Sequence, residues 1–282
     1  MKRKSLKLIC TALLVSMVGG AFAGCSSDKE GDKKSKKEST IISVSGSTSV
    51  GPLMEKLAQN YESDNKNISI EINQVGSSAG IKDTINGVSE LGMSSRELKS
   101  EESKEVKGTV IAFDGIAIIT NKNNPIKNIT LDQIKGIYTG KITNWKEIEG
   151  GKDAPIVVAS REEGSGTRDA FQEIVKYKSE ELRPDAMISN GNGGLKETVA
   201  GNENAIGFVS FEYLDDKVNI VNVEGIEPKA DLVKSGQYKI SRPFLVLSKE
   251  GDLTEDGQKL IDFILSDAGQ TIVKENKLIP VK

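Results

Sequence analysis

Histidine is absent from the 282-residue sequence, and cysteine is nearly so, with two residues that both lie within the first 25 positions. Without histidine the chain lacks the usual general base and the commonest metal ligand at neutral pH. Without cysteine beyond residue 25, the rest of the chain can form neither a disulfide nor a thiolate zinc site. These absences argue against a metalloenzyme and against a hydrolase built on an activated nucleophile.

An excess of positive charge is also missing, since the formal net charge is −3. A nucleic-acid backbone binds a clearly basic surface, so the composition gives no reason to expect a nucleic-acid partner. The 28% charged and 37% hydrophobic residues are typical of a soluble globular protein. The length leaves room for one large or two medium domains.

The N-terminus has the pattern of a secretory signal peptide. A basic head over residues 1–7 precedes an apolar stretch over 8–18 that is too short for a membrane span. Residues 22–25 (Phe-Ala-Gly-Cys) are similar to a bacterial lipobox, in which the cysteine is acylated, although Phe22 stands where an aliphatic residue is usual. We predict a signal peptide over 1–24 and a lipid, such as palmitate, on Cys25.

Residues 25–39 follow this predicted cleavage site and contain many lysines and almost no apolar side chains. Such a composition cannot build a core, so we predict a flexible tether. Its lysines either stay solvated or contact anionic headgroups.

The most informative stretch is ASREEGSGTR, from Ala159 to Arg168. An apolar strand candidate leads into a turn of Gly, Ser and Thr, and an amphipathic helical pattern follows. The first amides of a helix lack partners and carry a partial positive charge, so such a turn suits an anion. We predict that Arg161 supplies a planar donor fork, Ser165 and Thr167 supply hydroxyls, and Gly166 permits close backbone approach.

Two other interpretations of this stretch remain open. An ordinary helix cap within a glycine-rich loop has the same composition. A nucleotide P-loop needs a lysine before its final Ser or Thr, but Gly166 stands at that position.

Three further hydroxyl-rich turns follow predicted strands. Their candidate ligands are Ser47, Thr48, Ser49, Ser77, Ser95 and Arg96. Because open α/β sheets bind ligands at the carboxyl ends of their strands, we expect the four turns to meet at one anion site. The glycine-rich segment 191–194 is either a plain turn or a further anion contact.

Residues 110–119 are almost wholly apolar and predict a pair of strands interrupted at Asp114. A buried carboxylate is costly unless it is paired or hydrogen-bonded. Asp114 therefore either caps a turn before Gly115 or faces the anion site. Further along, Thr130 is the expected N-cap of a helix over 131–138.

In their order along the chain, these motifs resemble the PstS family, the phosphate-binding proteins of bacterial phosphate ABC importers. The resemblance runs from about residue 40 to the end, and the element from Arg161 to Thr167 is its most specific part. It implies a type II periplasmic-binding-protein fold, with two α/β lobes, two crossover strands and a ligand cleft between the lobes. We place lobe 1 at 40–120 plus 240–282 and lobe 2 at 121–239.

The resemblance implies a binding protein, not an enzyme, with no cofactor and no metal. Its expected partners are inorganic phosphate and the membrane permease subunits of a phosphate ABC importer. The lipid on Cys25 would anchor it, as a monomer, to the outer face of the cell membrane.

The resemblance also assigns ligands. It implies phosphate binding by Thr48, Ser49, Ser77, Arg161, Ser165, Gly166 and Thr167. Many family members carry Asp where Arg96 stands, and that Asp accepts the proton of phosphate and so disfavours sulfate. With Arg96 in its place, we expect Asp114 to act as the acceptor, with Glu163 second.

Three rival functions remain. A binder of another tetrahedral oxyanion, such as sulfate or molybdate, is the nearest. A secreted phosphatase would need a nucleophile or metal cluster that this composition makes hard to build. An adhesive or signalling lipoprotein would need no anion site.

Overall fold

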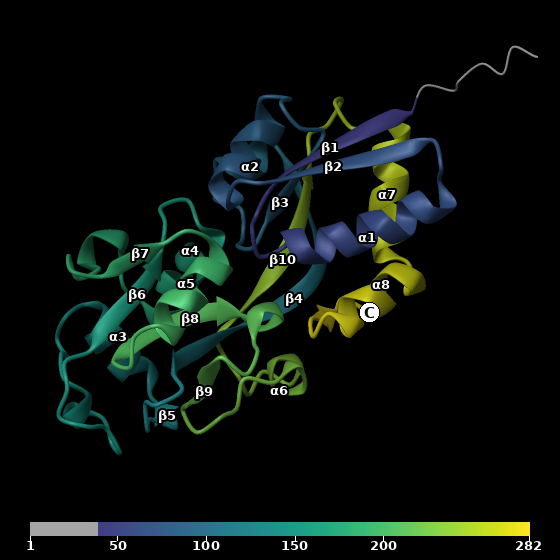
Figure 1. The fold of residues 1–282 in the computed structure, drawn as a ribbon. Helices are drawn as coiled ribbons and strands as arrows, with labels where there is room; N and C mark the ends of the chain where they lie inside the picture. Colours follow the sequence, from purple (N-terminus) through teal and green to yellow (C-terminus); the bar gives the residue numbers. More distant parts are fainter. Residues whose placement is uncertain (1–38) are drawn as a thin grey trace, which may run out of the picture. The chain divides into compact units, whose positions relative to one another are not determined.

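The computed structural model describes residues 39–282 of the protein. The predicted signal peptide, Cys25 and nearly all of the tether lie outside the described residues. Within 39–282, helices and strands alternate along most of the chain (Figure 1). None of the helices in this range combines the length and the apolar character needed to cross a membrane.

The described residues form two main hydrophobic cores, and we call the elements around each core a lobe. The core of lobe 1 draws on residues 42–112 and 244–278, and includes Leu57 and Phe244. The core of lobe 2 draws on residues 116–240, and includes Trp145 and Phe208. The chain therefore enters lobe 2 and returns from it once.

Lobe 1 is built from helices and strands of residues 40–112 and 241–280. Its elements are β1 (Thr40–Gly46), α1 (Gly51–Asp64), β2 (Ile68–Gln74), α2 (Ser77–Ile85), β3 (Leu91–Ser94), η1 (Glu102–Lys104), the first part of β4 (Lys107–Asn121), β10 (Ser241–Ser248), α7 (Glu255–Leu265), α8 (Asp267–Glu275) and β11 (Ile279–Pro280).

Lobe 2 contains the rest of β4 and the middle of the chain. Its further elements are β5 (Asn128–Ile129), α3 (Leu131–Tyr138), η2 (Trp145–Glu147), β6 (Val157–Arg161), α4 (Gly166–Val175), η3 (Ser179–Glu181), β7 (Met187–Ser189), α5 (Gly191–Ala200), β8 (Ala205–Ser210), η4 (Phe211–Tyr213), β9 (Val218–Val223) and α6 (Ala230–Lys234).

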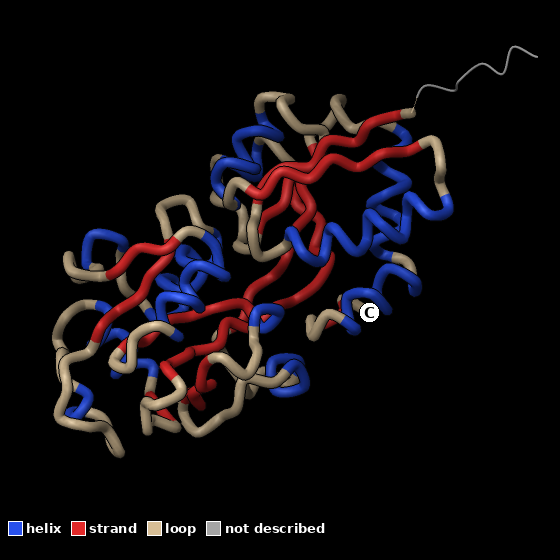
Figure 2. Tube along the Cα trace, in the orientation of Figure 1, coloured by secondary structure: helices blue, strands red, loops and turns tan. Residues whose placement is uncertain are grey.

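One sheet path joins the two lobes, in the strand order β2-β1-β3-β10-β4-β8-β6-β7. β1 is parallel to β2 and β3, and β6 is parallel to β7 and β8. β10 runs antiparallel to β4, and Figure 2 shows strands passing without a break from one lobe to the other. Because parallel strands end at a common edge, the loops after β1, β2 and β3 lie close to one another.

The strand pair predicted over 110–119 is wrong, because β4 is one continuous strand of 15 residues. Asp114 starts no turn. It lies directly opposite Arg242 of β10 in the antiparallel register, so its carboxylate has a cationic partner across the strands. An apolar strand tolerates a carboxylate where such a partner exists.

The predicted cap of the helix over 131–138 is confirmed. The Thr130 hydroxyl accepts the Gln133 amide at 3.1 Å, and the Gln133 side chain accepts the Thr130 amide at 2.9 Å. This capping box satisfies two amide groups that the helix itself leaves unpaired.

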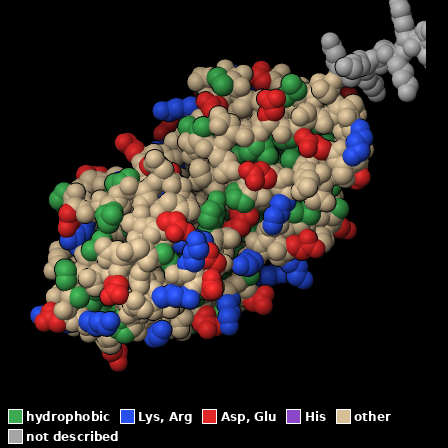
Figure 3. Space-filling model, in the orientation of Figure 1, with side chains coloured by type: hydrophobic (Ala, Val, Ile, Leu, Met, Phe, Trp, Pro, Cys, Tyr) green, Lys and Arg blue, Asp and Glu red, His purple; other side chains and the backbone are tan. Residues whose placement is uncertain are grey.

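Charged side chains of both signs are mixed over the face of the protein drawn in Figure 3. On this face, an anion would therefore be attracted by local groups rather than by a broad field of one sign.

Candidate functional site

Four helices begin at the turns that the sequence singles out. α1 begins at Gly51, α2 at Ser77, α4 at Gly166 and α5 at Gly191, each directly after the loop that ends a strand (Figure 1). The first amides of a helix have no partner within the helix itself, and they lie at the positive end of its dipole. Two of these helices belong to lobe 1 and two to lobe 2.

Six hydroxyl side chains gather where these turns meet, and we call them the hydroxyl cluster: Ser47, Thr48, Ser49, Ser77, Ser95 and Thr167. All are buried except the half-buried Thr48. In lobe 1, the Ser47 hydroxyl donates to Ser95 Oγ at 2.9 Å, and the oxygens of Ser77 and Ser95 lie 3.3 Å apart. Three separate loops of lobe 1 thus converge on one point.

The other half of the hydroxyl cluster spans both lobes. Ser49 Oγ and Thr167 Oγ1 lie 2.8 Å apart, although the residues are 118 positions apart in the chain. Arg161 donates from Nη2 to Thr48 Oγ1 at 3.1 Å, and from Nη1 to Thr167 Oγ1 at 3.5 Å. One guanidinium therefore contacts a hydroxyl from each lobe.

Gly166 joins the two halves of the hydroxyl cluster. A Cβ atom at this position would lie 2.2 Å from Ser77 Oγ and 2.8 Å from Ser95 Oγ, so only glycine fits without displacing them. The backbone makes a nearby cross-lobe bond, because the Ser78 amide donates to the Gly164 carbonyl at 3.2 Å. The first turn of α4 is thus held directly against the first turn of α2.

Arg161 is fully buried and pairs with its neighbour Glu162, whose carboxylate accepts Nε at 2.7 Å and Nη2 at 2.6 Å. Burial tends to raise the pKa of Glu162, but the Arg161 guanidinium outweighs it and holds that pKa below its ordinary value. Glu162 is therefore ionised at neutral pH, and it also accepts the Gly191 amide at 3.2 Å. The pair fixes the guanidinium plane while Nη1 and Nη2 still reach the hydroxyl cluster.

Arg96 lies outside the hydroxyl cluster, unlike its neighbour Ser95. Its guanidinium pairs with Glu102 through two bonds of 2.7 and 2.9 Å, and donates from Nε to Asp169 of α4 at 3.0 Å. Ser95 and Arg96 both follow the end of β3 at Ser94, but only the Ser95 side chain contacts the hydroxyl cluster. Arg96 instead links lobe 1 to α4 of lobe 2.

Asp114 is also not brought to the hydroxyl cluster. Its Oδ2 accepts Nε and Nη2 of Arg242 at 3.2 and 2.9 Å, and its Oδ1 accepts the Ser210 hydroxyl at 3.0 Å and the Phe211 amide at 3.2 Å. Burial raises the pKa of Asp114, although Arg242 and these hydrogen bonds oppose the shift. Protein groups thus occupy both oxygens of this carboxylate.

Two residues of the central turn differ in their placement. Ser165 is buried and caps α4, because its hydroxyl oxygen accepts the Arg168 amide at 3.3 Å. Its hydroxyl proton is left free to donate elsewhere. Glu163, the second expected acceptor, is exposed, whereas five of the six residues of the hydroxyl cluster are buried.

Sequence reasoning missed the contribution of Asn192. Its Nδ2 donates to Ser49 Oγ at 2.8 Å and its Oδ1 accepts the Ser210 amide at 3.2 Å, so it connects the hydroxyl cluster to the residues that hold Asp114. The glycines around it predict a turn, whereas residues 191–194 form the first turn of α5. The sequence feature that could have indicated this contact is the polar side chain of Asn192 within the glycine-rich segment.

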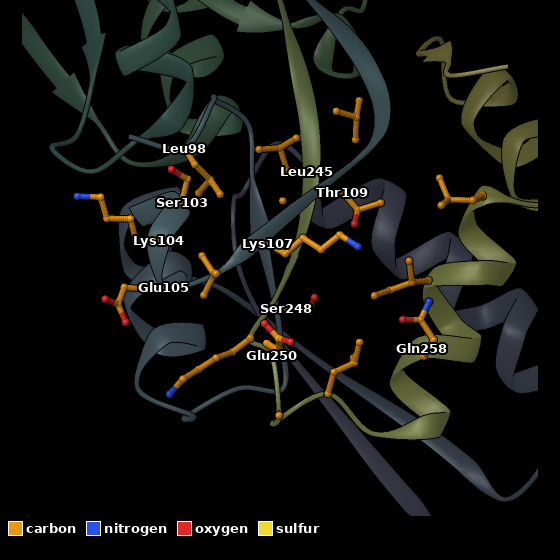
Figure 4. Close-up of a pocket in the computed structure, with 18 of the residues that line it drawn as sticks. Leu98, Ser103, Lys104, Glu105, Lys107, Thr109, Leu245, Ser248, Glu250 and Gln258 are labelled. Atoms are coloured by element: carbon orange, nitrogen blue, oxygen red, sulfur yellow. The ribbon is translucent and has the colours of Figure 1, made fainter. Parts of the chain in front are cut away.

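Within residues 39–282, no group of three or more Cys, Asp or Glu is arranged to hold a metal ion. A groove of about 1000 Å³ does lie in lobe 1, between the start of β4, the end of β10 and α7 (Figure 4). Leu98, Lys107 and Gln258 are among its lining residues, and no member of the hydroxyl cluster lines it. The groove therefore belongs to a different surface.

Known proteins resemble this chain in both sequence and structure. A family model described as the PBP superfamily domain matches residues 32–268. Phosphate-binding protein PstS of Bacillus subtilis is 31% identical over all of this chain and 95% of its own length. The PstS of Borreliella burgdorferi is 28% identical over 88% of this chain and 93% of its own length.

Two crystal structures extend the likeness to the fold. One, with bound phosphate, is of a Clostridium perfringens protein assigned as a phosphate ABC transporter substrate-binding protein. It is 59% identical, with a TM-score of 0.84 over 86% of this chain and 100% of that one. The other is an ABC-type phosphate transport receptor from Vibrio cholerae, 35% identical, with a TM-score of 0.74 over the same shares.

These matches confirm the predicted two-lobed α/β fold of the periplasmic-binding-protein type. They also confirm the family that the order of the turn motifs predicts. The chain belongs to the PBP superfamily and, within it, to the PstS family.

Proposed function

We propose that this protein captures inorganic phosphate between its two lobes, outside the cytoplasm, and delivers it to the permease of an ABC importer. One observation carries the proposal: Arg161, the hydroxyl cluster and four helix starts meet at the seam between the lobes. All of these groups offer donors or positive dipole ends to a tetrahedral anion. The names and bound phosphate of the matched proteins support the same ligand.

The proposed ligands come from both lobes. They are Ser47, Thr48, Ser49, Ser77, Ser95, Arg161, Ser165, Gly166 and Thr167, with Asn192 added from its contact with Ser49. Arg96 and Asp114 support the site from outside it. An ion bound to both lobes stabilises their contact, so we propose that phosphate closes lobe 1 (40–120 and 240–282) onto lobe 2 (121–239).

A second candidate ligand is another tetrahedral oxyanion, such as sulfate or molybdate. The observation in its favour is that no carboxylate among residues 39–282 accepts a hydrogen bond from the hydroxyl cluster, and that Glu162 and Asp114 are engaged elsewhere. Phosphate keeps a proton near neutral pH and needs an acceptor for it, whereas sulfate has none. The hydroxyl oxygens of the cluster can accept that proton, but they select for a protonated anion less strongly than a carboxylate does, which weakens discrimination between phosphate and sulfate.

The remaining features of the function are also proposals. We expect a monomer, anchored through a lipid on Cys25, that turns over no phosphate ester. The solute-binding character of the family supports the absence of catalysis.

Calorimetric titration of the purified protein with phosphate, sulfate and molybdate tests the proposal. We expect saturable binding of phosphate with one ion per chain. A flat phosphate titration would overturn the proposal, and tighter binding of sulfate or molybdate would favour the second candidate. Sustained release of product from a chromogenic phosphate ester would favour a phosphatase.

A further inference from the structure

One acidic side chain near the seam between the lobes has no partner. Glu212 lies in η4, directly after β8. Both of its carboxyl oxygens are buried without a hydrogen-bond partner, whereas its amide donates to Ser210 Oγ at 3.4 Å. A buried carboxylate without donors is costly, so this environment favours the neutral, protonated acid.

The nearest charged groups do not neutralise a negative charge on the Glu212 carboxyl. Burial is the largest influence on its pKa and raises it, and the carboxylates of Asp114 in β4 and Glu55 in α1 raise it further. Lys56 of α1 lowers it, but Nζ of Lys56 donates to the side-chain oxygen of Asn276 instead of to Glu212. The net result raises the pKa of Glu212 from 4.5 to about 8.

The other lysines that approach η4 are engaged as well. Lys196 of α5 donates to the Tyr213 carbonyl at 3.2 Å and pairs with Asp215. Lys277, beyond α8, donates to the Leu214 carbonyl at 3.2 Å. Neither lysine supplies Glu212 with a counter-ion.

Both lobes contribute to the surroundings of Glu212. Its chain neighbour Tyr213 donates from its hydroxyl to the Thr48 carbonyl of lobe 1 at 3.0 Å. Glu55 and Lys56, which act on the carboxyl, lie on α1 of the same lobe. Separation of the lobes would take these groups away from η4 and admit water to the carboxyl.

We propose that Glu212 couples anion capture to proton uptake, being protonated when the lobes are closed and ionised when they separate. This inference rests on the proposed function, because it takes lobe closure to be the result of anion binding. Glu212 is then a positioning residue that acts on closure without touching the anion.

The pH dependence of anion binding follows from the pKa of Glu212 in the closed and open forms of the protein. Below pH 4.5 the carboxyl carries the proton in both forms, and closure takes up none. Between 4.5 and about 8 closure takes up as much as one proton, so the affinity for the anion falls as the pH rises, by up to about tenfold per pH unit. Above about pH 8 the carboxyl is ionised in both forms, so the affinity for the anion no longer changes with pH through Glu212.

Calorimetry of phosphate binding at about pH 6.5, in two buffers of different ionisation enthalpy, measures the protons taken up per ion bound. The proton exchange of phosphate itself is common to all variants and cancels when wild type is compared with Glu212→Gln. We expect the wild type to take up close to one proton more than this variant. We also expect Glu212→Gln to bind phosphate at least about tenfold more tightly at pH 7. Glu197→Gln, which alters an exposed pair with Lys217, serves as the control and should match the wild type.

Equal proton uptake by wild type and Glu212→Gln, with phosphate bound by both, would overturn the inference and leave the proposed function standing. An absence of phosphate binding to the wild type would instead overturn the proposed function. If Glu212→Gln does not fold, infrared difference spectra of the wild type with and without phosphate decide the matter. A protonated-carboxyl band that grows on binding supports the inference, and its absence overturns it.

Discussion

Two buried arginines of this protein, Arg242 and Arg161, differ in what their remaining nitrogens contact. Nη1 of Arg242 is buried without a hydrogen-bond partner in the described part of the chain, whereas Nη1 and Nη2 of Arg161 donate to hydroxyls. Arg242 pairs with Asp114, which is 0% exposed and 128 residues away in the chain. Arg161 pairs with its chain neighbour Glu162, which is 25% exposed. Both pairs use two nitrogens, but only Arg161 also donates to hydroxyls of both lobes.

We therefore interpret Arg242–Asp114 as a structural pair and propose Arg161–Glu162 as a binding pair. Asp114 is enclosed by Arg242, Ser210 and Phe211, and the hydrogen bonds of these three residues offset the cost of burying its carboxylate. Glu162 is partly exposed to water, which lowers the cost of a second anion near the Arg161 guanidinium that it holds in place. Burial of an arginine therefore does not by itself mark a ligand-binding residue.

The largest expected effect concerns the structural pair. Asp114→Asn leaves the Arg242 guanidinium buried without a counter-ion, so we expect a loss of about 3 to 5 kcal/mol in the free energy of unfolding. Urea denaturation followed by circular dichroism measures it. Asp185→Asn is the matched control, because Asp185 also pairs with an arginine but is 65% exposed, and it should cost less than about 1 kcal/mol.

An equally small loss in both variants would show that the Arg242–Asp114 pair contributes no more to stability than the exposed pair of Arg183 with Asp185. Asp114→Asn protein that does fold also tests the predicted role of Asp114 as the acceptor of the phosphate proton. If Asp114 accepts the phosphate proton, this variant binds phosphate relatively less well than sulfate. We expect the ratio of the two affinities to stay unchanged.

The second effect concerns the binding pair. Arg161→Ala removes charge-assisted hydrogen bonds to the anion, so we expect phosphate affinity to fall by at least about 1.5 to 3 kcal/mol. Calorimetry measures the loss, and Arg183→Ala is the control, because Arg183 is a partly buried arginine of the same lobe that pairs with Asp185 and does not contact the hydroxyl cluster. Affinity close to that of the wild type would show that Arg161 is not a ligand.

A smaller effect is expected from the pair that links the lobes. Arg96→Met removes the pair with Glu102 within lobe 1 and the contact with Asp169, whose side chain is 31% exposed. Only the Asp169 contact links the lobes, so closure should weaken by about 1 kcal/mol, or fivefold in phosphate affinity. The same titration measures it. A loss as large as that of Arg161→Ala would place Arg96 among the ligands.

The smallest effect is expected at Glu163. This side chain is exposed, so Glu163→Gln should change phosphate affinity by less than about 0.5 kcal/mol. Parallel titrations with phosphate and sulfate are the measurement. A variant that gains affinity for sulfate relative to phosphate would restore Glu163 as the acceptor.

Local sequence patterns predicted the parts of the fold that depend on near neighbours. The strand, turn and helix from Val157 to Val175 and the Thr130 cap follow from side-chain period and capping chemistry within a few residues. The turns after β1, β2 and β3 could be expected to meet, because parallel strands share an edge.

The rest depends on contacts between distant residues. Arg242 meets Asp114 through the register of β4 and β10, which no local pattern specifies. For the same reason β4 was predicted as two strands, since an acid in an apolar run signals a need for a partner but not where the partner lies. Asn192 and Glu212 acquire their surroundings only when α5 and η4 fold against the first loop of lobe 1.

The passage of β4 and β10 side by side between the cores limits how the lobes can move. The two strands pair from Gly115 and Ser241 through Lys107 and Ser248, and the Asp114–Arg242 pair lies within that ladder. Adjacent, hydrogen-bonded strands can bend together about an axis that crosses both of them, but they resist sliding past each other because sliding would break the hydrogen bonds. Amide hydrogens of the ladder should therefore exchange slowly with solvent whether the lobes are together or apart.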